Sequence, residues 1–157
     1  MVRPDLPGAA RIGVIALDTN LLVYAHRADA TRHARARSRI AELLESGRAC
    51  GLPWPCVHEF LAIVTHPKIF RPASTHEQAL GALHAWLEAP AISLLGEGPD
   101  HLSRLSNLIR AGSIRGARVH DARVAAICLS HAVTALWTAD RDFSYFPELP
   151  TENPLVG

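Results

Sequence analysis

Residues 15–22 read IALDTNLL, so that an apolar run ends abruptly in the carboxylate of Asp18. The length and composition of the run from Gly13 to Leu17 are typical of a buried β-strand. Ligands of a parallel sheet bind just beyond the carboxyl ends of its strands, so Asp18 stands where an active-site acid is expected. Asn20 can cap the helix that follows. For a single aspartate, a turn or a helix cap is the simpler explanation, and only a recurrence of the pattern favours a site.

The pattern recurs near the end of the chain. Residues 133–138 form the clearest strand after the first, and this run too is followed by an acid, Asp140. Asp142 comes two residues later. In one parallel sheet the carboxyl ends of both strands open at the same edge, so Asp18 and Asp140 are expected to lie near one another.

Two further acids lie in the first turns of predicted helices. Glu59 belongs to a helix over residues 56–66, for which Pro55 suits the first position. A carboxylate among the apolar residues of that helix is unfavourable unless it has a cation or a partner. Asp121 belongs to a helix over 119–131 and begins a stripe of small residues on one face. Small residues let a helix approach a sheet closely, which would bring this acid near the strand ends.

The remaining segments alternate between strands and helices. They are a short helix from residue 21, a helix capped by Thr31 and running to 45, a strand at 49–52, a helix that opens with a capping box at 75–78, a strand at 91–95, a helix from 99, and a short final strand at 153–156. This order predicts an α/β protein, a three-layer α/β/α sandwich with a central parallel sheet.

Length and composition describe an ordinary globular chain. We expect a poorly ordered lead-in at residues 1–12, followed by a single domain at residues 13–157. No run approaches the roughly 20 apolar residues of a membrane span, and the N-terminus has no signal-peptide core. The three cysteines are odd in number and match no metal spacing, which suits small buried residues of a reducing, cytoplasmic protein: Cys50, Cys56 and Cys128.

Four acids in one place have a chemical consequence. Crowded carboxylates repel one another, and their pKa values rise unless a cation is present. Mg²⁺ and Mn²⁺ prefer oxygen ligands and can activate a water for attack on phosphorus. Taken singly, each acid has a structural explanation as a helix cap, a turn residue or a partner of an arginine. The four together, in this strand and helix context, favour a divalent-metal site.

At this point a resemblance to a known family becomes plain. It is carried by Asp18-Thr19-Asn20, by Glu59 after the second strand, by His120-Asp121-Ala122, and by the stretch 138–143, which reads TADRDF. These stretches resemble the acidic motifs of PIN-domain proteins, and they are most similar to the VapC toxins of bacterial toxin–antitoxin modules. The resemblance spans about residues 14–155.

The resemblance implies a function. A protein of this kind is expected to be a Mg²⁺- or Mn²⁺-dependent endoribonuclease that hydrolyses RNA phosphodiester bonds. It is also expected to form a homodimer and to be held inactive by a VapB-type antitoxin, whose C-terminal tail occupies the acidic groove. An alternative from another class is a non-catalytic PIN-fold module that binds RNA or protein, although such a module has no reason to keep four mutually repelling carboxylates.

The resemblance also implies roles for individual residues. The acidic site is formed by Asp18, Glu59, Asp121 and Asp140. The direct metal ligands are expected to be Asp18 and Asp121, while Glu59 and Asp140 complete the cluster directly or through water. Supporting groups are expected at Thr19, Asn20 and Thr138. Asp142 either replaces or assists Asp140, or faces solvent.

Arginine supplies nearly all of the positive charge. Of the 16 basic residues only Lys68 is a lysine. Arginine suits bidentate phosphate contacts, although a composition bias explains the excess equally well. The candidates for contacts with an RNA backbone are Arg27, Arg32, Arg35 and Arg123.

Receiver domains and haloacid-dehalogenase-like phosphatases also carry an aspartate after the first strand. Both need a lysine, however, and the only lysine here, Lys68, follows a proline in a predicted loop.

Overall fold

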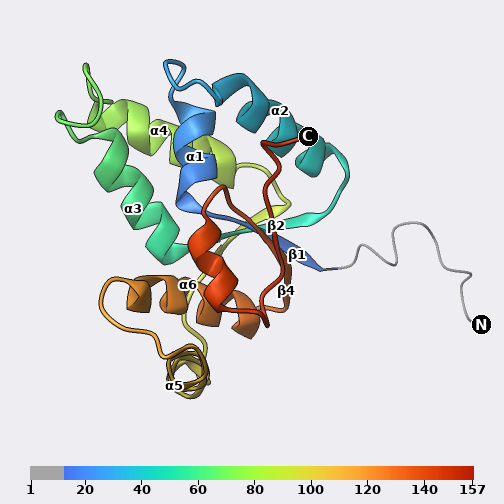
Figure 1. Ribbon diagram of the computed structural model, residues 1–157. Coiled ribbons are helices and arrows are strands. Elements are labelled where there is room, and N and C mark those ends of the chain that lie inside the picture. Colours follow the sequence, from blue (N-terminus) through green and yellow to red (C-terminus); the bar gives the residue numbers. More distant parts are fainter. Residues whose placement is uncertain (1–12) are drawn as a thin grey trace, which may run out of the picture.

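The computed structural model describes residues 13–157, and the lead-in predicted at residues 1–12 lies outside the described residues. Its centre is a five-stranded sheet in the order β3-β2-β1-β4-β5, in which every neighbouring pair is parallel (Figure 1). The strands are β1 (Val14–Leu17), β2 (Ala49–Pro53), β3 (Ile92–Leu95), β4 (Val133–Trp137) and β5 (Thr151–Glu152). The predicted parallel sheet is confirmed.

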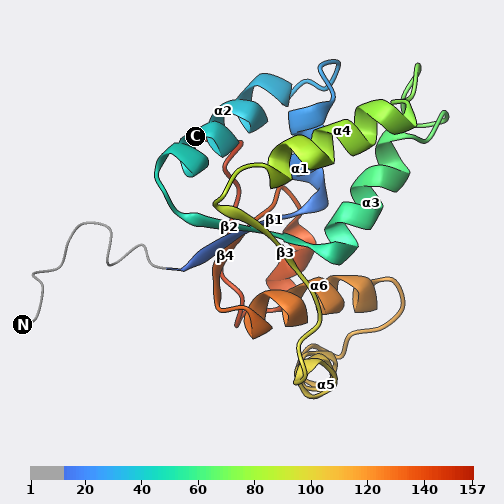
Figure 2. The same cartoon turned by 180° about the vertical axis from the view of Figure 1, so that it is seen from behind.

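Helices cover both faces of the sheet. One face carries α1 (Thr19–His26), α2 (His33–Glu45), α3 (Trp54–Val64) and α4 (His76–Leu87). The opposite face carries α5 (His101–Gly112), α6 (Arg118–Ser130) and the 3₁₀ helix η2 (Arg141–Tyr145). Figures 1 and 2 show the two groups from opposite sides. The predicted three-layer sandwich is therefore confirmed.

The residues of β1 contribute side chains to both hydrophobic cores. Ile15 and Leu17 belong to the core beneath α1–α4, whereas Ala16 belongs to the core beneath α5 and α6. This alternation follows from the two-residue period of a strand. Because both faces of β1 are covered, the strand reads as an unbroken apolar run that ends only at the carboxylate of Asp18.

The order of the strands reverses at β1. From β1 the chain moves outward to β2 and β3, and it then returns to pair β4 with the other side of β1. In open α/β sheets such a switch point leaves a crevice at the carboxyl ends of the two central strands, and ligands bind there. Asp18 follows β1 and Asp140 follows β4, so both acids stand at this crevice.

Three local predictions were wrong. Asp18, rather than Asn20, is the N-cap of α1, because the aspartate side chain accepts the Thr19 N–H. Thr31 caps nothing, since α2 begins at His33 and its N-cap residue makes no side-chain cap hydrogen bond. The last strand is residues 151–152 and not 153–156. Pro154 has no N–H to donate, and Asn153 turns the chain by accepting the Leu155 N–H.

Two further observations concern predictions about the whole chain. Within residues 13–157, no helix is both long enough and apolar enough to cross a membrane. All three cysteines are buried and free, as expected for small apolar residues of a core.

The capping box of α4 forms as predicted and allows a matched test of stability. Thr75 Oγ1 accepts the Gln78 N–H at 3.1 Å, and Gln78 Oε1 accepts the Thr75 N–H at 2.9 Å. We expect Thr75→Ala to lower the free energy of unfolding by about 1 kcal/mol in urea denaturation. The control Thr31→Ala removes the same hydroxyl where no cap exists and should change that free energy by less than about 0.5 kcal/mol. Equal effects would contradict the assignment.

Candidate acidic active site

Asp18 is held at the junction of β1 and α1 by several donors. Its carboxylate accepts hydrogen bonds from the Thr19 N–H at 2.8 Å and from the Thr138 hydroxyl at 2.7 Å. The Asn20 amide at 3.3 Å and the Cys56 thiol at 3.5 Å are weaker donors. The residue is only 7% exposed. Burial outweighs these hydrogen bonds and raises the pKa of Asp18, and the negative charge of Asp140 adds to the rise.

Thr138 and Asn20 tie the ends of the two central strands together. The Thr138 hydroxyl donates to Asp18 and accepts the Asn20 amide at 3.2 Å and the Asp140 N–H at 2.9 Å. Asn20 Oδ1 in turn accepts the Ala139 N–H at 3.1 Å. The loop after β4 is therefore fixed to the first turn of α1. Both residues thus form hydrogen bonds with Asp18 and with the loop that carries Asp140, and Asn20 does so from inside the helix.

Asp140 lies at the edge of this network and is exposed. Its Oδ1 accepts the Asp142 N–H at 2.8 Å and so caps η2. The side chain of Asp142 is exposed and does not line the cavity that Asp140 lines. Of the two alternatives for Asp142, the geometry favours a side chain that faces solvent, while its backbone orients Asp140.

Glu59 reaches the same region from the first turns of α3. Thr19 Oγ1 donates a hydrogen bond to Glu59 Oε2 at 3.3 Å, so the residue after Asp18 also holds the second acid. Partial burial raises the pKa of Glu59, and the charge of Asp18 raises it further. The aliphatic neighbours on α3 pack into the core beneath α1–α4, which leaves Glu59 on the face toward the strand ends.

Asp121 approaches from the other layer of the sandwich. It lies in the first turn of α6, as predicted, and behind it the helix is buried at the positions 122 and 124–128. Burial raises the pKa of Asp121 from 3.8 to about 6, and the next largest contributions are the charges of Asp140 and Asp18. The pKa of Asp121 is thus raised first by loss of hydration and then by the neighbouring carboxylates, a combination that is common at functional sites.

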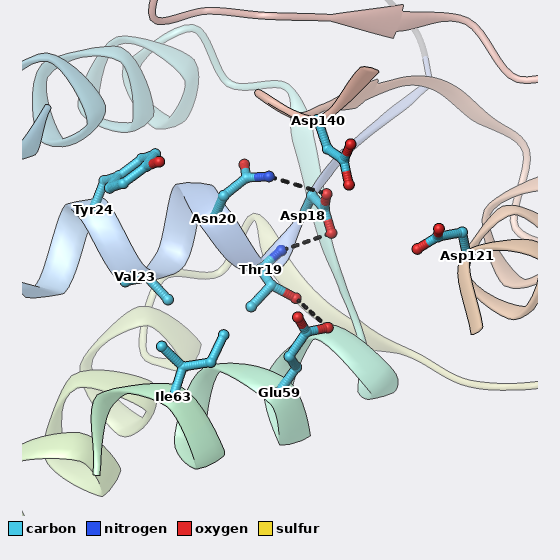
Figure 3. A pocket seen from close by; sticks show the side chains of 9 residues that line it. All are labelled: Asp18, Thr19, Asn20, Val23, Tyr24, Glu59, Ile63, Asp121 and Asp140. Atoms are coloured by element: carbon cyan, nitrogen blue, oxygen red, sulfur yellow. Dashed lines mark hydrogen bonds between the residues drawn. The ribbon is translucent and has the colours of Figure 1, made fainter. Parts of the chain in front are cut away.

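The four predicted acids line one cavity of about 240 Å³ at the switch point (Figure 3). Four different elements supply them, namely β1 with the start of α1, α3, α6 and the loop after β4. The other residues of this acidic cavity come from α1 and α3: Thr19, Asn20, Val23, Tyr24 and Ile63.

The chemistry of the cavity suits a hard divalent cation. Within residues 13–157, none of the four carboxylates forms an ion pair with arginine, lysine or histidine. Their mutual repulsion is therefore uncompensated by the protein, and oxygen donors of this kind are what Mg²⁺ and Mn²⁺ prefer. The oxygens do not yet converge: in the described part of the chain, no three acidic, cysteine or histidine side chains are arranged to hold an ion. Small rotations of side chains would be needed to bring them together.

The candidate arginines lie in different surroundings. Arg27 is largely engaged, since it forms an ion pair with Asp29 at 2.7 Å, donates to Ser74 at 3.2 Å and lies 4.4 Å from the ring centre of Phe70. It also stands at the far end of α1, roughly 12 Å from Asp18 for a helix of eight residues.

Arg32 and Arg35 are exposed beyond that end of α1, whereas Arg123 lies two residues from Asp121 on α6. The structure therefore brings only the last of these arginines close to the acids. A contact with RNA stays a prediction for all of them.

Sequence reasoning missed four residues around the acids. Val23, Tyr24 and Ile63 line the cavity, and the thiol of Cys56 donates to Asp18. Helical spacing could have found the first three, because positions 23 and 24 follow Asn20 by one turn and position 63 follows Glu59 by one turn. Nothing in the sequence pairs Cys56 with an acid 38 positions away.

Comparisons with known proteins agree with this fold. The sequence model of the PIN domain matches residues 15–149. Ribonuclease VapC43 of Mycobacterium tuberculosis is 34% identical over 144 residues, which cover 92% of this chain and 97% of that protein. Ribonuclease VapC31 of the same organism is 32% identical over 130 residues, or 83% of this chain and 91% of that protein.

Solved structures give the same fold. The VapBC2 structure from Rickettsia felis, bound to a DNA fragment from its promoter, has a TM-score of 0.66 at 17% identity and covers 89% of this chain and 98% of that one. VapBC-1 from nontypeable Haemophilus influenzae has a TM-score of 0.64 at 16% identity, with 91% and 99% covered. The chain therefore belongs to the PIN-domain family and, within it, to the group of the VapC ribonucleases.

The raised pKa of Asp121 makes stability depend on pH. Between about pH 4 and pH 6 the folded state holds a proton on Asp121 that the unfolded state releases, so the contribution of this group to stability is fully present below pH 4 and is lost as the pH rises through 6. The carboxyl group is partly exposed to solvent, so we discount the effect to about 1 kcal/mol.

In EDTA at pH 7.5 we therefore expect Asp121→Asn to melt roughly 2–4 °C above the wild type, with no difference near pH 4. The control Glu148→Gln removes one negative charge from an exposed loop and should not melt higher than the wild type. Scanning calorimetry at both pH values makes the comparison, and a Tm for Asp121→Asn at or below that of the wild type at pH 7.5 would contradict it.

Proposed function

We propose that this protein is a metal-dependent endoribonuclease, the toxin of a toxin–antitoxin pair, that hydrolyses RNA phosphodiester bonds and is neutralised by a VapB-type antitoxin. One observation carries the proposal: four carboxylates from four elements line one cavity at the switch point of a PIN-type sheet. The relatives named ribonuclease match nearly the whole chain, which supports the same activity here. We treat residues 13–157 as one PIN-like domain.

The proposed cofactor is Mg²⁺, with Mn²⁺ able to substitute. Asp18 and Asp121 are the proposed direct ligands, and Glu59 and Asp140 bind directly or through water. A bound divalent ion supplies a water of lowered pKa and stabilises negative charge that develops on a phosphate. The raised pKa values of Asp18, Glu59 and Asp121 support this assignment, because a cation would relieve the repulsion that contributes to them.

The protein's own contribution is to keep the acids in place. Thr138 and Asn20 hold Asp18 between the two central strands, and Thr19 holds Glu59. Asp18 is buried and cannot turn away, whereas Asp121 and Asp140 are more exposed and retain rotamer freedom. We infer that Asp18 would be the fixed ligand of a metal, and that Glu59, Asp121 and Asp140, which are all more exposed than Asp18, would adjust to it.

The proposed partners follow from the same group of relatives. They are an RNA substrate, a VapB-type antitoxin and a second copy of this chain. Solved neighbours include VapBC assemblies, which supports an antitoxin partner for a chain of this fold. A cytoplasmic location stays a prediction.

The alternative function is a non-catalytic PIN-fold binding module, which retains the fold but does not need the acids. Substitution of the acids therefore distinguishes the nuclease from the binding module.

Cleavage of RNA should depend on metal and on the acids. We expect the purified protein, freed of any antitoxin, to cut a mixed RNA pool with Mn²⁺ and to leave it intact with EDTA. Asp18→Asn and Asp121→Asn should lower the cleavage rate at least roughly a hundredfold while circular dichroism shows an unchanged fold. The control Asp142→Asn makes the same substitution outside the cavity and should keep most of the activity. Cleavage that persists in both acid variants would rule out this mechanism.

Metal binding should be visible without any substrate. Because an ion that binds only the folded state stabilises it by mass action, Mn²⁺ at about 100 times its Kd should add about 2.7 kcal/mol to the free energy of unfolding. The Tm of the wild type should rise with Mn²⁺, and that of Asp18→Asn should rise less. A Tm that stays flat up to millimolar Mn²⁺ would count against metal binding by these carboxylates.

A further inference from the structure

A second cavity adjoins the acidic cavity on the side of α3 and α6. It has a volume of about 350 Å³, which lies within the range of ligand sites. Three acids line both cavities, namely Asp18, Glu59 and Asp121. We call these three carboxylates, which belong to the walls of both cavities, the ridge. Anything extended that crosses the acids therefore occupies both cavities at once.

The two cavities differ in the charge of their outer walls. Among the described residues, no basic side chain lines the acidic cavity, whose other walls include Val23 and Ile63. The second cavity is lined by His58, His120 and Arg123. A phosphate on the ridge is repelled by the carboxylates, and the only cation of permanent charge among the lining residues is the guanidinium of Arg123. The second cavity is thus the side on which a further phosphate can be held.

Glu97 orients the guanidinium of Arg123 but does not engage all of its N–H donors. Glu97 Oε1 accepts from Nε at 2.6 Å and lies 2.5 Å from Nη2, so one carboxylate oxygen holds one edge of the guanidinium. A guanidinium has five N–H donors in a planar fork, which leaves the Nη1 edge for another acceptor. The side chain is 40% exposed, and Glu97 itself does not line the cavity. Arg123, which lines the cavity, therefore keeps donors that can bind a phosphate.

An aromatic pair extends from the wall of the same cavity, which His58 lines and Trp54 does not. Trp54 and His58 lie one turn apart on α3, with ring centres 5.7 Å apart and planes tilted by 46°. Trp54 is 39% exposed, in contrast to Trp137, which is 5% exposed. Exposed aromatic rings next to a basic side chain are the usual means of binding a base of single-stranded nucleic acid.

We propose that the second cavity binds the nucleotide next to the scissile phosphodiester, with Arg123 contacting its phosphate and the Trp54–His58 pair stacking its base. The inference rests on the proposed function, because it assumes that the strand to be cut crosses the shared carboxylates. A phosphodiester on the ridge has nucleotides on both sides, and the basic and aromatic wall distinguishes one side from the other. The enzyme would thereby read the strand in one direction only.

A matched set of ion-pair variants tests the phosphate contact. The probe is a fluorescein-labelled octaribonucleotide of random sequence, bound in Ca²⁺ in place of Mn²⁺ and followed by anisotropy at several salt concentrations. We expect Arg123→Gln to raise Kd roughly tenfold and to reduce the slope of log Kd against log salt by about 0.7.

Two controls separate a phosphate contact from a general effect of charge. Arg104→Gln removes the same charge from a similarly exposed ion pair, with Asp100, outside both cavities, and it should match the wild type. Glu97→Gln breaks the pair but keeps the cation, so its Kd should equal or fall below that of the wild type. Equal effects of Arg123→Gln and Arg104→Gln, or of Arg123→Gln and Glu97→Gln, would overturn the contact.

The base contact has its own readout. We expect the octaribonucleotide to quench tryptophan fluorescence in the wild type, and we expect this quenching to disappear in Trp54→Phe. Quenching that persists in Trp54→Phe would overturn the stacking assignment.

The two proposals can fail separately. If the wild type cuts RNA with Mn²⁺ while Arg123→Gln binds the octaribonucleotide as well as the wild type does, the second cavity is not this subsite and the nuclease stands. If binding depends on Arg123 but no RNA is cut, the subsite stands and the nuclease does not.

Discussion

The burial of one carboxylate, that of Asp18, is the constraint on which the rest of the site depends. A buried acid must be surrounded by donors, and here they come from α1, α3 and the end of β4. Thr138 is the central donor, because its hydroxyl contacts Asp18, Asn20 and the backbone of Asp140 together. The two strands at the switch point are thus joined through a side-chain network at the point where the sheet itself ends.

That network explains which parts of the structure could be predicted from the sequence. Asp18 and Asp140 follow apolar strands, while Glu59 and Asp121 lie in the first two turns of helices, and such positions are visible in a single sequence. The parallel sheet followed from the alternation of elements and then brought the acids to one edge. The sequence could not show that Asn20 binds the loop after β4, since its partner Ala139 lies 119 positions away.

The two errors about helix caps have a common physical cause. Thr31 and Asn20 are both good capping residues by type, yet the cap of α1 is Asp18, and Thr31 caps nothing. Capping preference is a local property worth about 1 kcal/mol, whereas the position of a helix start is set by packing against the sheet. Arg27 shows the same limit, because its engagement with Ser74 depends on a loop 47 positions away.

The position of the acids between two openings has a consequence for the form of the substrate. A blind pocket must receive the end of a chain, whereas a ridge that is open on both sides lets a strand lie across it. Here three carboxylates belong to the walls of two adjoining cavities, as the proposed path of the strand requires. A nuclease built in this way needs no free 5′ or 3′ terminus, so a closed circle of RNA is as acceptable to it as a linear strand.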